Sequence, residues 1–227
     1  MGTEKLTAEM KRNALLVVRR GSIVYGTRMP GSDIDILAVV PDDYRDFLSH
    51  YENGIFQEPI DENNYEPVND WQFVSLSDFK QMAKDHTVLA METMCTPPDE
   101  IVWNIWYDNL EFAKSLLPLD KWKIRQQFSG TSSNSWAKAH KKMTVEKDYD
   151  IYKAKKSLFH SLRILMFAIQ LCEREQIYDF KEAKPLWDEI ILTPEYYPWE
   201  YYKKKYRPMY NSLRSKLAEL APKPKNS

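Results

Sequence analysis

The pattern of apolar and polar positions predicts two short strands early in the chain. Residues 15–18 form an apolar, partly β-branched run, and residues 34–40 alternate before they become fully apolar. Such runs are typical of strands that other elements cover on at least one face. Between them lie Gly21, Gly26 and Gly31, half of the six glycines in the chain. This concentration of glycine predicts tight turns or a close approach of the backbone to a ligand.

The second half of the chain has a helical pattern. Residues 153–175 are expected to form a long helix with one buried stripe, made of Leu158, Leu162, Leu165 and Ile169. Residues 103–120 are also helix-like, and Pro118 marks an expected domain boundary near their end. The polar stretch 129–142 beyond this boundary is predicted to be a loop. Three leucines between residues 213 and 220 predict a closing helix.

Composition narrows the class of protein. The 227 residues are 43% hydrophobic and 29% charged, which is ordinary for a soluble globular protein. No apolar run approaches the ~20 residues that a membrane span needs. The first residues lack an apolar signal segment, so we expect a cytoplasmic protein with no membrane partner. The two cysteines exclude a disulfide framework, and with no Cys-x-x-Cys and four scattered histidines we expect no structural zinc site.

Charge is strongly segregated along the chain. The net charge is −1 overall, but it is −15 over residues 33–120 and +8 over residues 121–163. Two interpretations stay open at this point. The segments are either two functional surfaces, one bearing a metal and one facing a polyanion, or two solvated faces whose opposite signs assist folding.

The start of the second predicted strand carries two carboxylates. Asp33 and Asp35 are two residues apart, so on a strand they project from the same face. Like charges at the start of an apolar strand need protons or a cation nearby, and oxygen-only ligands suit Mg²⁺. The pattern excludes an EF-hand loop and a Walker A loop. Asp-x-Asp alone also occurs in glycosyltransferases, but Gly21-Ser22 lies about ten residues upstream and can offer backbone amides and a hydroxyl to phosphate.

Together, Gly21-Ser22 and Asp33-x-Asp35 resemble the signature of the DNA polymerase β-type nucleotidyltransferase superfamily. The fuller string is similar to one branch, the RlaP-like predicted nucleotidyltransferases associated with RNA repair, some of which are phage-encoded. The additional residues that match this branch are Tyr25, Gly26 and Ser32. The resemblance implies an α+β fold, with a polymerase β-like domain and small mixed sheet at 1–117. A helical domain at 118–220 and a disordered tail at 221–227 would follow.

The resemblance also implies a third carboxylate, Asp70, on a later strand. Asp33, Asp35 and Asp70 would then hold Mg²⁺ (or Mn²⁺), and Asp70 would help to deprotonate an attacking hydroxyl. The alternative for Asp70 is a strand-edge position beside the acidic residues Asp61, Glu62 and Glu66. Ser22 would contact the β- and γ-phosphates, or serve as a helix N-cap, or both. Tyr25 would pack beneath the glycine loop or line the pocket.

A Lys…His-x-x-Arg pattern of the same branch appears on the predicted helix 153–175. Lys156, His160 and Arg163 share one face, which is a solvated face by spacing alone. The resemblance implies that they bind nucleotide or an RNA phosphate. Trp136 among several lysines adds character suited to RNA, although a tryptophan is equally typical of a core.

The expected activity is Mg²⁺-dependent transfer of NMP from an NTP, such as ATP, to a hydroxyl of RNA or tRNA. Two alternatives remain. One is a catalytically silent regulatory protein that binds nucleotide or RNA, and the other is transfer to a protein or small-molecule acceptor. The sequence leaves the oligomeric state and the choice of NTP open.

Overall fold

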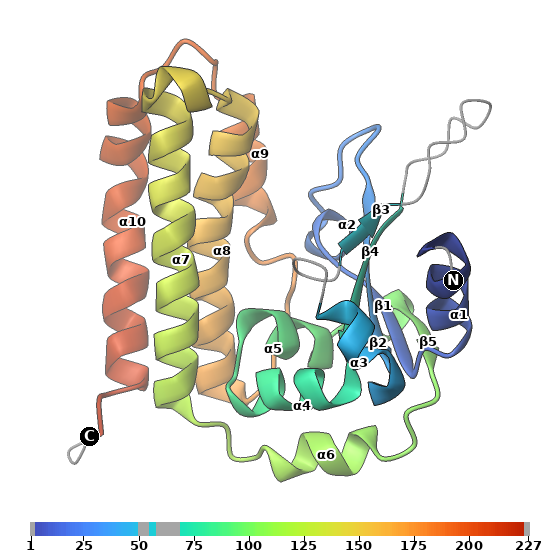
Figure 1. Ribbon diagram of the computed structural model, residues 1–227. Helices are drawn as coiled ribbons and strands as arrows, with labels where there is room; N and C mark the ends of the chain where they lie inside the picture. Colours follow the sequence, from blue (N-terminus) through green and yellow to red (C-terminus); the bar gives the residue numbers. More distant parts are fainter. Residues whose placement is uncertain (1–2, 50–54, 58–68, 225–227) are drawn as a thin grey trace. The chain divides into compact units, whose positions relative to one another are not determined.

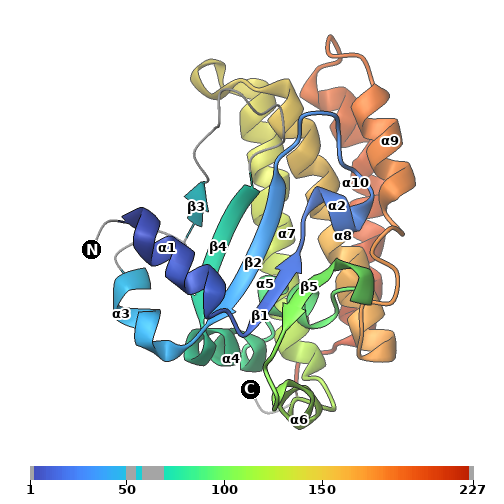
Figure 2. The ribbon, with the colours of Figure 1, turned by 90° about the vertical axis from the view of Figure 1, so that its right-hand side faces the viewer.

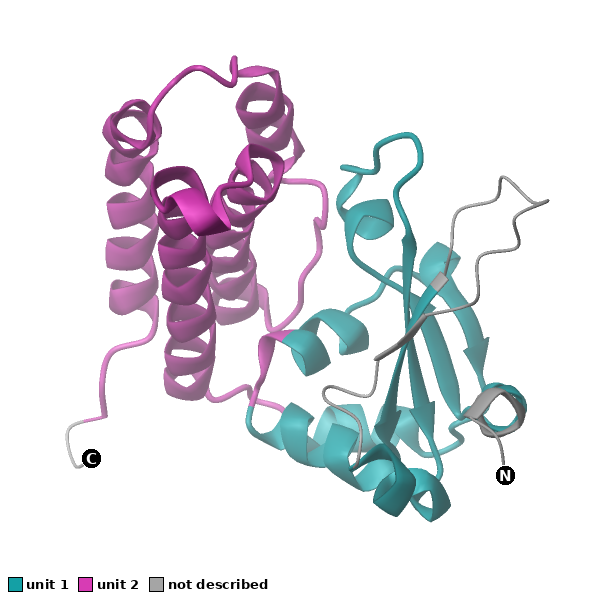
Figure 3. Cartoon of the chain, turned by 45° about the horizontal axis from the view of Figure 1, so that its top comes forward, with its two compact units in different colours: residues 1–85, 89–116 teal, residues 86–88, 117–227 magenta. Residues whose placement is uncertain are grey.

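The computed structural model describes residues 3–49, 55–57 and 69–224. The chain divides into two compact units, which Figure 3 shows in different colours. The first consists of residues 1–85 and 89–116, and the second of residues 86–88 and 117–227. A mixed sheet with helices makes up the first unit and helices make up the second, so the α+β fold class is confirmed.

The first unit is built on a five-stranded sheet, with the strands side by side in Figure 2 in the order β3-β4-β2-β1-β5. Strands β2 and β4 run parallel, and every other neighbouring pair is antiparallel, which confirms the small mixed sheet. The bounds are β1 Leu16–Arg19, β2 Ile34–Val40, β3 Ile55–Gln57, β4 Asn69–Ser75 and β5 Ile101–Asn104. Strand β2 has the predicted bounds, and β1 lies one residue later than predicted.

Apolar packing covers one sheet face with helix α1 (Thr3–Arg12), the 3-10 turn η1 (Asp42–Tyr44) and α3 (Arg45–Leu48). Met10 and Leu48 pack there against Ile36, Ala38 and Phe73 of the sheet. On the other face, α2 (Ser22–Tyr25) and α4 (Leu76–Lys84) contact β2. The first unit also contains most of α5 (Val88–Met94), η3 (Pro98–Glu100) and α6 (Asn109–Ser115).

The second unit is a set of packed helices, visible in Figure 1. Helices α7, α8 and α10 contact one another pairwise, and α9 contacts α8. The predicted leucine stripe of α8 is buried, as expected. The bounds are α7 Lys121–Thr144, η4 Glu146–Asp148, α8 Ile151–Arg174, α9 Lys184–Leu192 and α10 Trp199–Leu220. No helix in the described part of the chain is long and apolar enough to cross a membrane.

The prediction of a loop at residues 129–142 is wrong, because this stretch lies inside the 24-residue helix α7. Asp120 caps the helix by accepting a hydrogen bond from the Lys123 N–H at 3.1 Å. Buried residues then recur mostly at every fourth position, at Ile124, Phe128, Ser132 and Trp136, with Ala139 three residues further on. Ser132 is fully buried and its hydroxyl donates to the Ser161 carbonyl of α8 at 2.6 Å, so a small polar side chain serves helix packing here.

The helix expected over residues 103–120 is also wrong in its first part. Residues 101–104 form strand β5, which pairs with β1, and the helix that follows is limited to Asn109–Ser115. Hydrogen bonding to β1 has overridden the helical pattern. Of the predicted tail, Ala221 is buried and its carbonyl accepts from Arg125, while residues 225–227 lie outside the described residues.

Candidate active site

Two of the three predicted carboxylates lie side by side. Asp35 of β2 is the direct register partner of Asp70 of the parallel strand β4. Partners in register project from the same face, and neighbouring strands lie about 4.8 Å apart. That face is the one opposite the core of α1 and α3, because the adjacent residues Ile36 and Trp71 pack in that core. The register therefore places two acidic side chains together, one from each of two central strands.

Asp33 directly precedes β2 and is exposed, whereas Asp35 and Asp70 are partly buried. Among the described residues, no group of three His, Cys, Asp or Glu side chains is arranged to hold a metal ion. The three-carboxylate metal site therefore stays a prediction. The acidic neighbours Asp61, Glu62 and Glu66, which carried the alternative interpretation of Asp70, lie outside the described residues.

Gly21 lies against the carboxylate of Asp35. Its φ is +67°, in the left-handed region that favours glycine, and a Cβ at this position would overlap the Oδ2 of Asp35. Gly21 also occupies the N-cap position of the single turn α2, so Ser22 is the first helical residue and not the cap. The N-cap interpretation of Ser22 is thus wrong, and its hydroxyl is not needed for that purpose.

A buried polar contact holds the glycine loop in place. Tyr25, at the end of α2, is 4% exposed, which agrees with packing beneath the loop. Its hydroxyl donates to Oε2 of Glu92 on α5, and Glu92 is itself buried. A charge-assisted bond in a buried setting is stronger than a neutral surface one. The loop that carries Gly21 and Ser22 is therefore fixed to a helix of the same unit.

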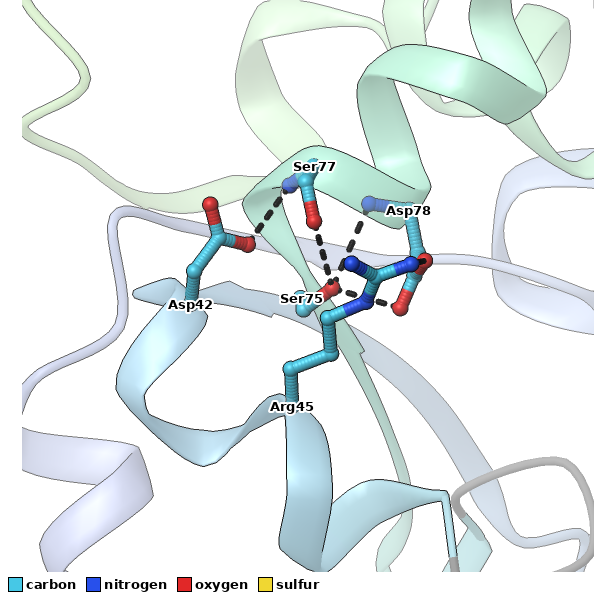
Figure 4. Close-up of polar contacts among 5 residues, drawn as sticks. All are labelled: Asp42, Arg45, Ser75, Ser77 and Asp78. Carbon is cyan, nitrogen blue, oxygen red and sulfur yellow. Dashed lines mark hydrogen bonds and ion pairs between the residues drawn. The ribbon is translucent and has the colours of Figure 1, made fainter.

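At the opposite ends of the two parallel strands, polar groups satisfy one another (Figure 4). Ser75, the last residue of β4, caps α4: its hydroxyl accepts from the Asp78 N–H at 3.2 Å and donates to Asp78 Oδ2 at 2.6 Å. Asp42, just beyond β2, accepts from the Ser77 N–H at 2.8 Å, and Arg45 forms an ion pair with Asp78 at 3.0 Å. These contacts link the chain after β2 to the end of β4 and so support the register of Asp35 and Asp70.

Those contacts also change the acidity of one of the carboxyl groups. The pKa of Asp42 lies below its usual 3.8, mainly because the Ser77 backbone N–H donates to the ionised form. The Arg45 guanidinium lowers it further.

The three residues predicted on the long helix belong to the second unit. Lys156 is exposed, His160 is partly buried, and Arg163 is only 4% exposed. The Arg163 Nε–H donates to His160 Nδ1 at 3.3 Å, and its guanidinium lies 4.7 Å from the centre of the Phe167 ring. The interpretation of this helix face as fully solvated is therefore wrong at Arg163.

His160 is surrounded by positive charge. Its pKa lies well below the usual 6.5, first because burial disfavours the charged imidazolium. The positive charges of Arg163, Lys156 and Lys138 lower it further. The ring is therefore neutral at pH 7, and since Nδ1 accepts a hydrogen bond, the proton resides on Nε2.

Comparison with known proteins bears on the first unit. Residues 4–89 match the sequence model of a family described as the nucleotidyltransferase domain, and this range includes Gly21, Ser22, Asp33, Asp35 and Asp70. The first unit carries a nucleotidyltransferase domain. The residues of α8 lie outside the matched range, so the match leaves the second unit unassigned.

Among curated proteins, none matches the chain. One similar solved structure is that of a nucleotidyltransferase-like protein from Exiguobacterium sibiricum 255-15. It is 12% identical, the alignment covers 97% of this chain and 74% of that one, and the TM-score is 0.32. A similarity this low adds nothing to the assignment.

Sequence reasoning missed one pair near the carboxylates of the nucleotidyltransferase domain. The Arg20 Nη1–H donates to Gln72 Oε1 at 2.6 Å, although Arg20 is one of several arginines around the glycine loop and nothing in its type distinguishes it. A signal did exist. Arg20 is two residues beyond Val18, which pairs with Leu37, so alternation places Arg20 on the face of Asp35.

Proposed function

We propose that this chain transfers NMP from an NTP to a hydroxyl group of RNA or tRNA, with a divalent metal ion. The observation that carries the proposal is the direct register of Asp35 and Asp70 beside the Gly21 loop, within the part that matches the nucleotidyltransferase domain. Carboxylates paired in this way repel each other unless a cation or protons offset their charge.

The donor set fits Mg²⁺ or Mn²⁺, since it consists of carboxylate oxygens alone. Asp33, which is exposed just before β2, would hold the metal together with Asp35 and Asp70. When bound, such ions offset the charge that develops on the entering and leaving oxygens of phosphoryl transfer.

The residues of the chain then have defined tasks. The acceptor hydroxyl oxygen forms a bond to the α-phosphorus, the bond from that phosphorus to the bridging oxygen breaks, and pyrophosphate leaves. Asp70 takes the proton of the acceptor hydroxyl. Ser22 and the backbone at Gly21 bind the β- and γ-phosphates, and the absence of a Cβ at Gly21 leaves the carboxylate of Asp35 in place.

An RNA acceptor is favoured by the charge of the second unit. Residues 121–163 carry a net charge of +8, which suits binding to a phosphate backbone. Within that unit, the exposed Lys156 shares a helix face with His160 and Arg163, and all three side chains can donate hydrogen bonds to phosphate oxygens. We assign phosphate binding to this group.

The test is incubation of the protein with each labelled NTP, Mg²⁺ and total RNA, with protein and small-molecule acceptors in parallel. Labelled RNA that depends on Mg²⁺ and is lost in an Asp33→Ala, Asp35→Ala double variant supports the proposal. If labelled product forms only on protein or only on a small molecule, that molecule is the acceptor in place of RNA. Binding of nucleotide or RNA that is unaffected by Mg²⁺, without product on any acceptor, contradicts transfer and indicates a regulatory binding protein.

A further inference from the structure

Arg20 directly follows β1 and lies on the sheet face that carries the carboxylates. Its backbone N–H donates to the Asp35 carbonyl at 2.9 Å, directly after the β1–β2 pairing ends at Arg19 and Ile36. Asp35 is therefore flanked by Arg20 on the β1 side and by Asp70 on the β4 side. The sheet itself therefore places a cationic residue, Arg20, next to the acidic pair.

The side chain of Arg20 reaches across strand β2. The sheet order places β2 between β1 and β4, and the Arg20 Nη1–H donates to Oε1 of Gln72 on β4 at 2.6 Å. Gln72 is two residues beyond Asp70, so the two share a face. The guanidinium is therefore held above β2, on the side of the sheet where Asp35 and Asp70 project.

The charge of Arg20 remains available to a ligand. Its side-chain partner in the described part of the chain is the neutral amide of Gln72, and none of the ion pairs there includes it. A guanidinium has five N–H donors, and one bond to an amide oxygen leaves the others for a further acceptor. Its neighbour Arg19 differs, because it forms an ion pair with Glu100 at 3.6 Å.

We infer that Arg20 is a substrate-binding residue, which Gln72 positions to bind a phosphate oxygen of the nucleoside triphosphate. This inference rests on the proposed function. Planar, bidentate donors suit phosphate oxygens, and a guanidinium already anchored by Gln72 loses less conformational freedom on binding than a mobile one. Gln72 acts through Arg20 and is a positioning residue. A backbone phosphate of RNA has the same chemistry, so the experiment separates the two sources.

The experiment measures binding to the full-length chain by calorimetry, with Mg²⁺ and the four α,β-methylene NTPs, which cannot be transferred. Arg20→Met is expected to weaken nucleotide binding by about tenfold to a hundredfold, as for loss of a charged hydrogen bond. Arg20→Lys retains part of the affinity, because it keeps the charge but loses the planar donors. Gln72→Leu leaves Arg20 intact and is expected to weaken binding by a smaller factor, with an unchanged thermal midpoint.

Arg19→Met is the matched control, since it removes an adjacent arginine of the opposite sheet face and is expected to leave nucleotide affinity within about twofold. Equal affinities of wild type and Arg20→Met, or an equal loss in Arg19→Met, would overturn the inference. A loss of affinity for single-stranded RNA alone would assign Arg20 to the acceptor and overturn it as well. If the wild type neither binds any of the four analogues nor transfers any NTP, the proposed function fails, which is a different outcome.

Discussion

The two ends of the parallel pair β2 and β4 differ in how their polar groups are satisfied. At the carboxyl ends, Ser75, Asp78 and Asp42 accept or donate hydrogen bonds within the protein, and Arg45 pairs with Asp78 (Figure 4). At the other end, Asp35 and Asp70 stand in direct register, with like charges on neighbouring strands. Like charges at such positions destabilise a sheet.

This difference separates stability from function within one pair of strands. The carboxyl ends contribute to the register through a helix cap and hydrogen bonds. These groups take no part in the proposed transfer. The acidic end carries unfavourable repulsion that the fold tolerates because the rest of the pair is fixed. We therefore expect substitutions at the acidic end to lower transfer without lowering stability, and substitutions at the carboxyl ends to do the reverse.

The largest effect is expected from Asp35→Asn and Asp70→Asn. Each removes a charge needed to hold the metal, so transfer should fall by about a hundredfold or more. The free energy of unfolding, measured by urea denaturation, should stay equal or rise slightly because repulsion across the strands is removed. A variant that unfolds more easily than wild type by more than about 1 kcal/mol would break the proposed separation of roles.

The next effect is that of Gly21→Ala. A Cβ there would overlap Asp35 Oδ2 and would force a left-handed residue, so transfer should fall about tenfold and stability by ~1–2 kcal/mol. The matched control is Gly31→Ala, because Gly31 has a similar φ of +77° but no atom within 4 Å of the added Cβ. Thermal melts and transfer rates of both variants separate backbone strain from displacement of Asp35. Equal loss of transfer in the two would show that the contact with Asp35 is irrelevant.

At the carboxyl ends, Ser75→Ala should lower the free energy of unfolding by ~1 kcal/mol, since the cap of α4 is lost. Transfer by the folded protein should stay within about twofold of wild type, because Ser75 lies five positions along β4 from Asp70. Ser77→Ala is the control: it removes a hydroxyl that contacts Ser75 at 3.4 Å, while the backbone N–H of residue 77 still donates to Asp42. A greater loss of stability in Ser77→Ala than in Ser75→Ala would contradict the assigned cap.

Local pattern was enough to predict strand β2 with its bounds and the long helix α8, because both have a clear periodicity and defined ends. It failed for α7, where Ser and Asn suggested a loop. Ser132 is buried where α7 meets α8, so its small size serves the packing of these two helices. The contact between the two helices cannot be seen in the sequence. The start of the helix predicted after residue 102 failed for a similar reason, since pairing with β1 is not local.

The candidate site was only partly accessible to the same reasoning. The spacing of Asp33 and Asp35 and the glycines between the strands are local features, and the Gly21 conformation agrees with them. The register of Asp35 with Asp70 depends on a parallel pairing across more than thirty residues of sequence. The pair Arg20 and Gln72 depends on that register too, which explains why the arginine could not be distinguished from its neighbours.

The smallest effect is a change in the pH dependence of stability through Asp42. Its pKa in the folded protein is below 3.8, chiefly because the Ser77 N–H donates to the carboxylate. A lowered folded-state pKa contributes stability above pH 3.8 that is lost as the pH falls through the folded value. Asp42→Asn should therefore lower the thermal midpoint at pH 7 by less than Ser75→Ala does, and this gap from wild type should shrink below pH 3.8.

The adjacent Asp43 gives the control for this comparison, because it is exposed and makes no hydrogen bond with a described side chain or backbone group. Asp43→Asn should leave the midpoint unchanged at both pH 7 and pH 3. If the gap between wild type and Asp42→Asn were the same at both pH values, the bond to the Ser77 N–H would not depend on the carboxylate charge.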